Sequence, residues 1–162
     1  MRGRLASLLT VLCLVTSVAP AADMTQAFLS QAAALNRFQV ASGNLALRKT
    51  QSAVVHGFAQ QMIFEYSVAA GKLRQAAADA KLPLRDALDE RHKALLDQLT
   101  HTAPGKTLSK AYFEAQEKVL RDDTALLQGY AESGDNERLK VYAQEMVPVL
   151  RGHLAQLGKL RK

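Results

Sequence analysis

Two polar side chains that interrupt apolar helical stripes are the strongest candidates for chemistry in this sequence. Glu65 stands in a stripe with Met62 and Ala69, and His153 follows Leu150 at a spacing of three in a second stripe. Residues three and four positions apart share one face of a helix, so both polar groups are expected to turn toward the interior. Burying a carboxylate or an imidazolium alone is costly, and each therefore needs a partner or partial exposure.

Two interpretations of this pair follow from the sequence. In the structural one, Glu65 and His153 form a hydrogen bond in the core or lie at the edges of their stripes. We favour it because buried polar pairs are more often structural than functional. In the functional one, Glu65 and His153, with Tyr66 beside them, bind a divalent metal ion inside the bundle. Charge pairing matters within about 4 Å, so the distance between the two side chains decides whether they form a pair.

The sequence gives little support for a di-iron or haem centre. Di-iron carboxylate proteins use Glu-x-x-His on two helices, and this chain contains no Glu-x-x-His. Asp89-x-x-His92 has the same spacing but stands alone in a charged segment. Met24 or Met62 could pair with His153 on a haem, but methionines in an apolar stripe usually fill a core.

No motif for catalysis is present. The chain lacks a G-x-S-x-G elbow and a glycine-rich phosphate loop. Glu114 and Glu117 are expected to form a solvated, salt-bridged face with Lys110, Lys118 and Arg121. We therefore expect a protein that is not an enzyme and that carries no cofactor other than the divalent metal considered above.

The first residues are typical of a secretory signal peptide. Arg2 and Arg4 precede an apolar run from Leu5 to Val18, and small residues follow at 19–21. The run is shorter than the about 20 residues that a membrane-spanning helix requires. We predict a signal peptide at 1–21 and export to the periplasm, with outer-membrane association as a further option and no transmembrane segment in the mature chain.

The predicted mature chain, residues 22–162, contains no cysteine. The single cysteine, Cys13, lies within the apolar run that the signal peptidase would remove. Disulfides, thiolate metal sites, cysteine nucleophiles and covalent haem attachment are thereby excluded from the mature protein. Roughly 140 residues are enough for one domain with a proper core.

Helical periodicity extends along the whole mature chain. It predicts helices over about 24–49, 53–80, 85–100, 108–132 and 136–160. Four are long, and the helix at 85–100 is short and lies in a connection between two hairpins. We predict an all-α fold and a single domain, a ferritin-like four-helix bundle with a short extra helix in the long crossover. An up-down bundle with an extra helix is the alternative.

The charge of the chain bears on its partners. The formal net charge is +6, and the C-terminus is basic, with Lys159, Arg161 and Lys162. Such an excess favours weak attraction to an anionic envelope component, and an envelope protein is an alternative partner. Dense clusters of lysine and arginine with interleaved aromatic residues are missing, so we do not expect nucleic-acid binding.

The order of several short segments resembles domain-of-unknown-function family 4142, a group of exported bacterial proteins. The matching segments are Gly43-Asn44-Leu45-Ala46, Val55 with Phe58-Ala59-Gln60-Gln61-Met62, Leu82-Pro83, Tyr112 with Gln116, Gly134-Asp135 before Leu139, and Val147-Pro148-Val149-Leu150 leading to His153-Leu154. The resemblance covers about residues 28–160. It implies a ferritin-like bundle and an envelope location.

The sequence departs from this family at positions where the family has histidines. The family typically has Asp-His where this chain has Glu65 and Tyr66, and a histidine where it has Leu120. His153 is the one family histidine that is kept. We therefore expect an exported periplasmic or envelope-associated protein with a non-catalytic binding, structural or stress-related role. The alternative is a ferritin-like metal-binding protein with a degenerate site inside the bundle.

Overall fold

The computed structural model describes residues 21–161, and within that range it contains five helices and no strand. They are α1 (Ala21–Lys49), α2 (Ala53–Asp79), α3 (Glu90–His101), α4 (Lys106–Ser133) and α5 (Glu137–Leu160). The all-α prediction is confirmed. The predicted signal peptide lies outside the described residues except for Ala21, which begins α1, and it stays a prediction.

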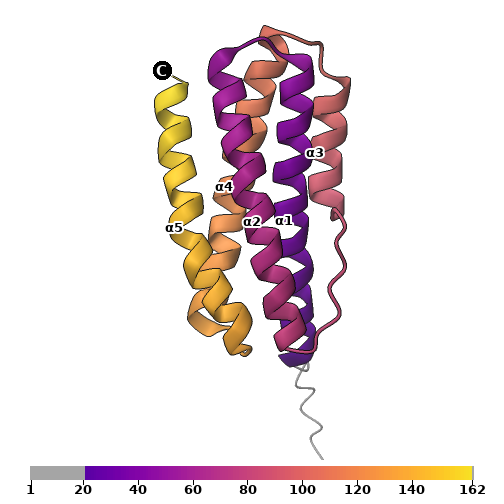
Figure 1. Cartoon of the computed structure of the whole chain (residues 1–162), viewed down its shortest axis with the longest axis vertical. Helices are drawn as coiled ribbons and strands as arrows, with labels where there is room; N and C mark the ends of the chain where they lie inside the picture. The colour runs from indigo at the N-terminus through magenta and orange to yellow at the C-terminus, as the bar shows by residue number, and fades with distance from the viewer. Residues whose placement is uncertain (1–20, 162) are drawn as a thin grey trace, which may run out of the picture.

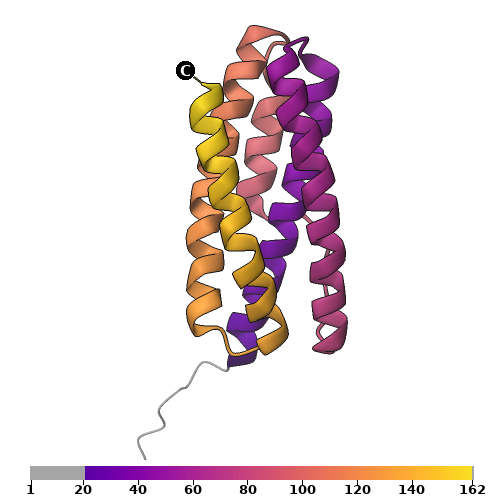
Figure 2. The same ribbon diagram turned by 60° about the vertical axis from the view of Figure 1, so that its left-hand side comes forward.

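Two antiparallel hairpins, α1 with α2 and α4 with α5, form the four long helices (Figures 1 and 2). The chain returns along the bundle after α2, and α3 packs against α1 and α4. At one end the amide of Gly105 donates to the carbonyl of Lys49 at 3.0 Å. At the other end the hydroxyls of Thr25 and Tyr130 are 2.9 Å apart. These two contacts make α1 and α4 antiparallel neighbours.

The buried face of α2 differs by one position from the stripe expected at Glu65. Tyr66 is buried, whereas Glu65 is only partly covered. The side chain of Glu65 is 33% exposed. A stripe drawn from residue type alone cannot separate two adjacent positions when one of them is an amphipathic tyrosine. Glu65 thus lies at the edge of the core, as the structural interpretation allowed.

Helix α3 begins at Glu90 rather than near residue 85 as predicted. The carboxylate of Asp89 accepts a hydrogen bond from the amide of His92 at 2.8 Å, which satisfies one of the unpaired donors at the start of a helix. The charged segment before Asp89 has no such cap and is not helical. The cap therefore sets the beginning of the helix.

Close packing of the first hairpin depends on Gly43. A Cβ at this position would lie 2.8 Å from Cγ1 of Ile63 and 3.1 Å from the carbonyl oxygen of Ala59. The missing side chain lets α1 approach the backbone of α2, so this glycine holds α2 at a fixed depth in the bundle. None of the described helices is both long enough and apolar enough to cross a membrane.

Candidate functional site

Glu65, His153 and Tyr66 form one cluster between α2 and α5, and we call it the α2–α5 cluster. Nε2 of His153 lies 2.8 Å from Oε2 of Glu65, and Nδ1 of His153 lies 3.4 Å from the hydroxyl of Tyr66. The three residues predicted as a site therefore converge. They converge on opposite sides of the imidazole ring, because Glu65 and Tyr66 contact different nitrogens.

The hydrogen bonds of the α2–α5 cluster fix the form of the imidazole. A carboxylate only accepts, so Nε2 of His153 donates its hydrogen to Glu65 and leaves Nδ1 as the acceptor for the Tyr66 hydroxyl. Gln61 donates to Oε1 of Glu65 at 2.9 Å, and Gln156 donates to Oε1 of Gln61 at 2.9 Å. A chain of hydrogen bonds thus leads from the surface seam between α2 and α5 to the core.

Burial sets the electrostatics of the α2–α5 cluster. Removal from water lowers the pKa of His153 below its usual range, and the nearby Glu65 carboxylate opposes that shift. Burial also raises the pKa of Tyr66 well above its usual range, and neighbouring acidic and phenolic groups add to the effect. A neutral imidazole facing a neutral phenol is the state that these surroundings favour near neutral pH.

Although Glu65, His153 and Tyr66 resemble an acid–base–nucleophile series, their burial is unfavourable for catalysis. A nucleophile must reach a substrate, and the Tyr66 side chain is 0% exposed. Its raised pKa also keeps the oxygen protonated. The only member of the cluster with substantial exposure is Glu65.

A metal ion could be held by two of these residues. Zinc binds imidazole nitrogen and carboxylate oxygen at about 2.0–2.2 Å in tetrahedral geometry, so two ligands of one ion lie roughly 3.3–3.5 Å apart. Oε2 of Glu65 and Nε2 of His153 are 2.8 Å apart, so they would bind one ion after a small separation and loss of the Nε2 hydrogen. Tyr66, on the other nitrogen, would orient the ring as a supporting partner. Among residues 21–161 no group of three or more His, Cys, Asp or Glu side chains is arranged to hold a metal ion.

A second carboxylate–imidazole cluster lies between α3 and α4, and we call it the α3–α4 cluster. Nδ1 of His92 is 2.8 Å from Asp89, and its Nε2 is 3.1 Å from Asp123. Arg91 donates to Asp123 at 2.5 Å. His92 is 0% exposed and Asp123 is 1% exposed. The imidazole ring also packs against Phe38 of α1, with ring centroids 5.3 Å apart.

Only half of the α3–α4 cluster can be predicted from the sequence. The spacing of Asp89-x-x-His92 predicts an isolated pair, which is wrong because Asp123 from α4 completes the cluster. A usable signal was present, since Asp123 and Thr124 stand between Val119 and Leu127 on the buried face of α4. A buried carboxylate there required a cationic partner from another helix.

The other candidate residues, one histidine and two methionines, are explained by local structure. His56 hydrogen-bonds the carbonyl oxygen of Thr50 at 2.6 Å and so ties the first turn of α2 to the hairpin loop. Met62 is buried in the core, whereas Met24 is 66% exposed.

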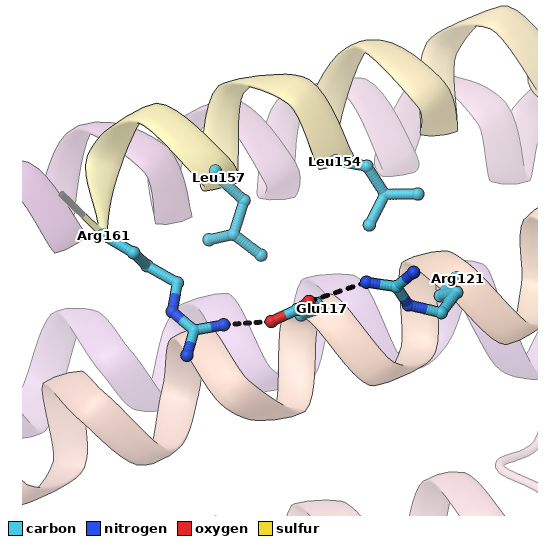
Figure 3. A pocket seen from close by; sticks show the side chains of 6 residues that line it. Glu117, Arg121, Leu154, Leu157 and Arg161 are labelled. Carbon is cyan, nitrogen blue, oxygen red and sulfur yellow. Dashed lines mark hydrogen bonds and ion pairs between the residues drawn. The ribbon is translucent and has the colours of Figure 1, made fainter.

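The salt-bridged face predicted on α4 is present and includes an unexpected partner from α5. Lys110 pairs with Glu114, and Arg121 donates to Glu117 at 2.7 Å. Arg161, at the end of α5, pairs with the second oxygen of Glu117. Figure 3 shows the Glu117 carboxylate between these two arginines, with Leu154 and Leu157 extending from α5 toward α4 above it.

Comparison with known proteins identifies the family. The family model described as "Domain of unknown function (DUF4142)" matches residues 14–160, which is most of the chain. The chain therefore belongs to this family. Searches of curated proteins and of solved structures each found no match.

Proposed function

We propose that this DUF4142 protein is exported to the periplasm and works there, or at the envelope surface, by binding rather than catalysis. The partner is an anionic envelope component, recognised by one end of the bundle. The closed α2–α5 cluster supports a non-catalytic role, because its hydroxyl is buried and its imidazole is already hydrogen-bonded on both sides.

The observation that carries the proposal is the concentration of basic side chains at one end of the bundle. The end formed by the α1–α2 loop, the start of α4 and the end of α5 is lined by exposed or half-exposed basic side chains: Arg48, Lys49, Lys106, Lys110, Lys159 and Arg161. We call it the basic end. The opposite end, around the α4–α5 turn and the end of α2, carries both signs of charge: Asp79, Glu132, Asp135 and Glu137 with Lys81, Arg85, Arg138 and Lys140. A molecule charged in this way approaches an anionic surface with its basic end first.

Co-sedimentation with lipid vesicles tests this proposal. The mature protein is expected to bind vesicles of phosphatidylglycerol but not of phosphatidylcholine, and binding should weaken as salt rises because the Debye length shortens. Replacing Arg48, Lys106 and Lys110 by glutamine should weaken binding about 10- to 100-fold at low salt, since each basic side chain near an anionic surface contributes about 1 kcal/mol.

A matched control removes the same number of charges elsewhere. The exposed residues Lys81, Arg85 and Arg138 lie toward the other end of the bundle, and glutamine at all three should leave the affinity within about twofold if the basic end does the binding. Equal losses in the two triple variants, or binding that does not depend on salt, would rule out a role specific to the basic end.

The location is tested by recovering the protein from cells. A C-terminally tagged full-length chain should be released with the periplasmic fraction and begin at Ala22. Recovery from the cytoplasm with Met1 or Arg2 at the N-terminus would refute export. The ferritin-like assignment is supported by the hairpin pairing and the crossover that runs along the bundle, which are features of that class.

Metal binding by Glu65 and His153 is the second candidate function, and the 2.8 Å between their side chains is the observation that favours it. Zn²⁺ or Cu²⁺ titrated into chelator-treated protein should bind one equivalent, and Glu65→Gln or His153→Gln should abolish that binding. The control is His56→Gln, since the imidazole of His56 is paired with a backbone carbonyl. Unchanged stoichiometry in both cluster variants would exclude this candidate.

A further inference from the structure

The surface between α4 and α5 contains a pocket that combines positive charge with an apolar floor. Its volume is about 410 Å³, and it is lined by Glu117, Arg121, Leu154, Leu157, Gly158 and Arg161. The pocket lies near the basic end, where the last turns of α5 pack on α4 (Figures 1 and 3). Its volume is within the range of about 300–1,000 Å³ that small-molecule sites occupy.

The polar side of the pocket carries one more positive charge than negative. Glu117 gives one carboxylate oxygen to Arg121 and the other to Arg161. A guanidinium has five N–H donors, so both arginines keep donors for a further anion. The side chain of Arg121 is 69% exposed and that of Arg161 is 37% exposed, so these donors are accessible from solvent. Glu117 holds the two arginines on either side of its carboxylate in advance of any ligand.

The apolar side of the pocket is built on α5. Leu157 is buried, Leu154 is half-buried, and Gly158 leaves the groove open because no atom lies within 4 Å of the position that its Cβ would take. The lining contains no aromatic ring on which a nucleobase could stack. An aliphatic chain is the ligand part that this floor fits.

We propose that this pocket binds the anionic head and the first methylene groups of a single-chain amphiphile, such as an alkyl phosphate or a fatty acid. The head bridges Arg121 and Arg161, and the chain lies over Leu154 and Leu157. The inference deepens the proposed function, on which it rests, by naming the ligand class that the protein takes from an anionic envelope. Charge-assisted hydrogen bonds fix the head, and removal of the chain from water adds affinity.

Calorimetric titration with dodecyl phosphate or laurate, at concentrations where both are monomeric, tests the pocket. At least one of them should bind the mature protein, whereas inorganic phosphate and dodecanol, which each supply half of the ligand, should bind at least about tenfold more weakly. Gly158→Leu fills the groove and should weaken binding at least tenfold. Gly158→Ala is the matched control, since its single methyl group leaves most of the space free.

The charge of the pocket is tested separately. Arg121→Gln together with Arg161→Gln should reduce the affinity at least about tenfold, while Arg151→Gln, on α5 but outside the pocket lining, should leave it within about twofold. Full affinity in Gly158→Leu, or equal binding of inorganic phosphate, would overturn the proposal. So would the absence of any binding by both amphiphiles.

The two proposals fail in different ways. The basic-end triple variant leaves Arg121 and Arg161 in place, so it should lose vesicle binding and keep the affinity for the amphiphile. Gly158→Leu should do the opposite. If vesicles bind but neither amphiphile does, the proposal for the pocket is wrong and the proposal for the basic end is kept. If the amphiphile binds but vesicles do not, the proposed role at the envelope is wrong.

Discussion

The α2–α5 and α3–α4 clusters use the same pair of groups, a carboxylate and an imidazole, in different surroundings. In the α3–α4 cluster, His92 lies between two carboxylates and beside an arginine, and both His92 and Asp123 are buried. In the α2–α5 cluster, His153 has one carboxylate, which is 33% exposed, and a phenol. One carboxylate of each cluster, Asp89 or Glu65, is 33% exposed, but only the α3–α4 cluster has a second carboxylate, Asp123, that is buried and also paired with an arginine.

This difference indicates that the α3–α4 cluster stabilises the fold, whereas the α2–α5 cluster is the candidate binding site. Helix α3 is short and makes few contacts with the bundle other than those to α1 and α4, so the α3–α4 cluster anchors the crossover. The α2–α5 cluster joins two long helices that are also held by their apolar faces. We therefore expect the α3–α4 cluster to matter more for stability, although the α2–α5 cluster is the one that sequence reasoning selects.

The largest expected effect comes from breaking the α3–α4 cluster. Asp123→Asn leaves the buried His92 without its second carboxylate and the partly exposed Arg91 without its closest partner. Loss of one member of a buried ion pair costs about 3–5 kcal/mol, and urea denaturation should show a decrease of that size in the free energy of unfolding. Amide exchange in α3 should rise more than elsewhere, because the crossover loses its anchor.

Asp122→Asn is the matched control for that variant. Asp122 is adjacent, carries the same charge and contacts Arg91 at 3.3 Å, but its side chain is 42% exposed. Exposed pairs contribute roughly 0–1 kcal/mol, so the stability should change little. If both variants lower the free energy of unfolding by the same amount, the α3–α4 cluster does not stabilise the fold as a buried ion pair.

A smaller loss is expected from the α2–α5 cluster. Glu65→Ala removes the acceptor of His153 at 2.8 Å, yet the vacated site is partly open to water, which can replace the hydrogen bond. We expect a decrease of about 1–2 kcal/mol in the free energy of unfolding, measured by the same urea titration. If Glu65→Ala lowers the free energy of unfolding as much as Asp123→Asn or more, the α2–α5 cluster contributes at least as much to stability as the α3–α4 cluster, and the comparison is wrong.

The pH dependence of stability distinguishes the imidazole of His153. Because burial lowers its pKa in the folded state, the unfolded chain takes up a proton at this residue first as pH falls. Stability should therefore be complete above the unfolded pKa of about 6.5 and decrease as pH falls from there through the folded value. Urea midpoints from pH 8 to 5 should fall less steeply in His153→Leu than in the wild type. An unchanged or steeper slope would contradict the assignment.

The smallest effects concern the buried tyrosine hydroxyls. Tyr142 exchanges hydrogen bonds with Asn36 at 2.9 and 3.3 Å, so Tyr142→Phe should cost about 1 kcal/mol. The hydroxyl of Tyr112 has no partner among the described residues, so Tyr112→Phe should be neutral or slightly stabilising. Tyr66→Phe should fall between them, since its bond to His153 is long at 3.4 Å. Thermal melting of the three variants gives the order, and a different order would question the Tyr66 contact.

Much of this architecture could be predicted from the sequence because stripes of leucine and alanine report burial directly. The five helices, and the inward-facing positions of Glu65 and His153, followed from spacing within single helices, whereas the contact between these two side chains required the structure. The α3–α4 cluster did not, because its members come from a cap, a short helix and a distant long helix. Spacing within one segment cannot show which helices become neighbours, and an aspartate at a helix start is normally interpreted as a cap alone.

The surface features were harder to predict for a different reason. Arg161 and Glu117 are 44 positions apart, and only the antiparallel register of α4 and α5 brings them together. The basic end likewise combines three separate chain segments, although the basic C-terminus was noted. The net charge can be counted from the sequence, whereas the position of the charged residues along the bundle depends on the topology.

The protonation of His153 tests the central claim most directly. Nitrogen-15 NMR of metal-free protein labelled at histidine, with the resonance assigned through His153→Gln, reports the hydrogen on each ring nitrogen. At pH 7.5 we expect a neutral ring with hydrogen on Nε2 toward Glu65 and a bare Nδ1 toward Tyr66. A doubly protonated ring, or hydrogen on Nδ1 alone, would contradict the closed hydrogen-bond arrangement.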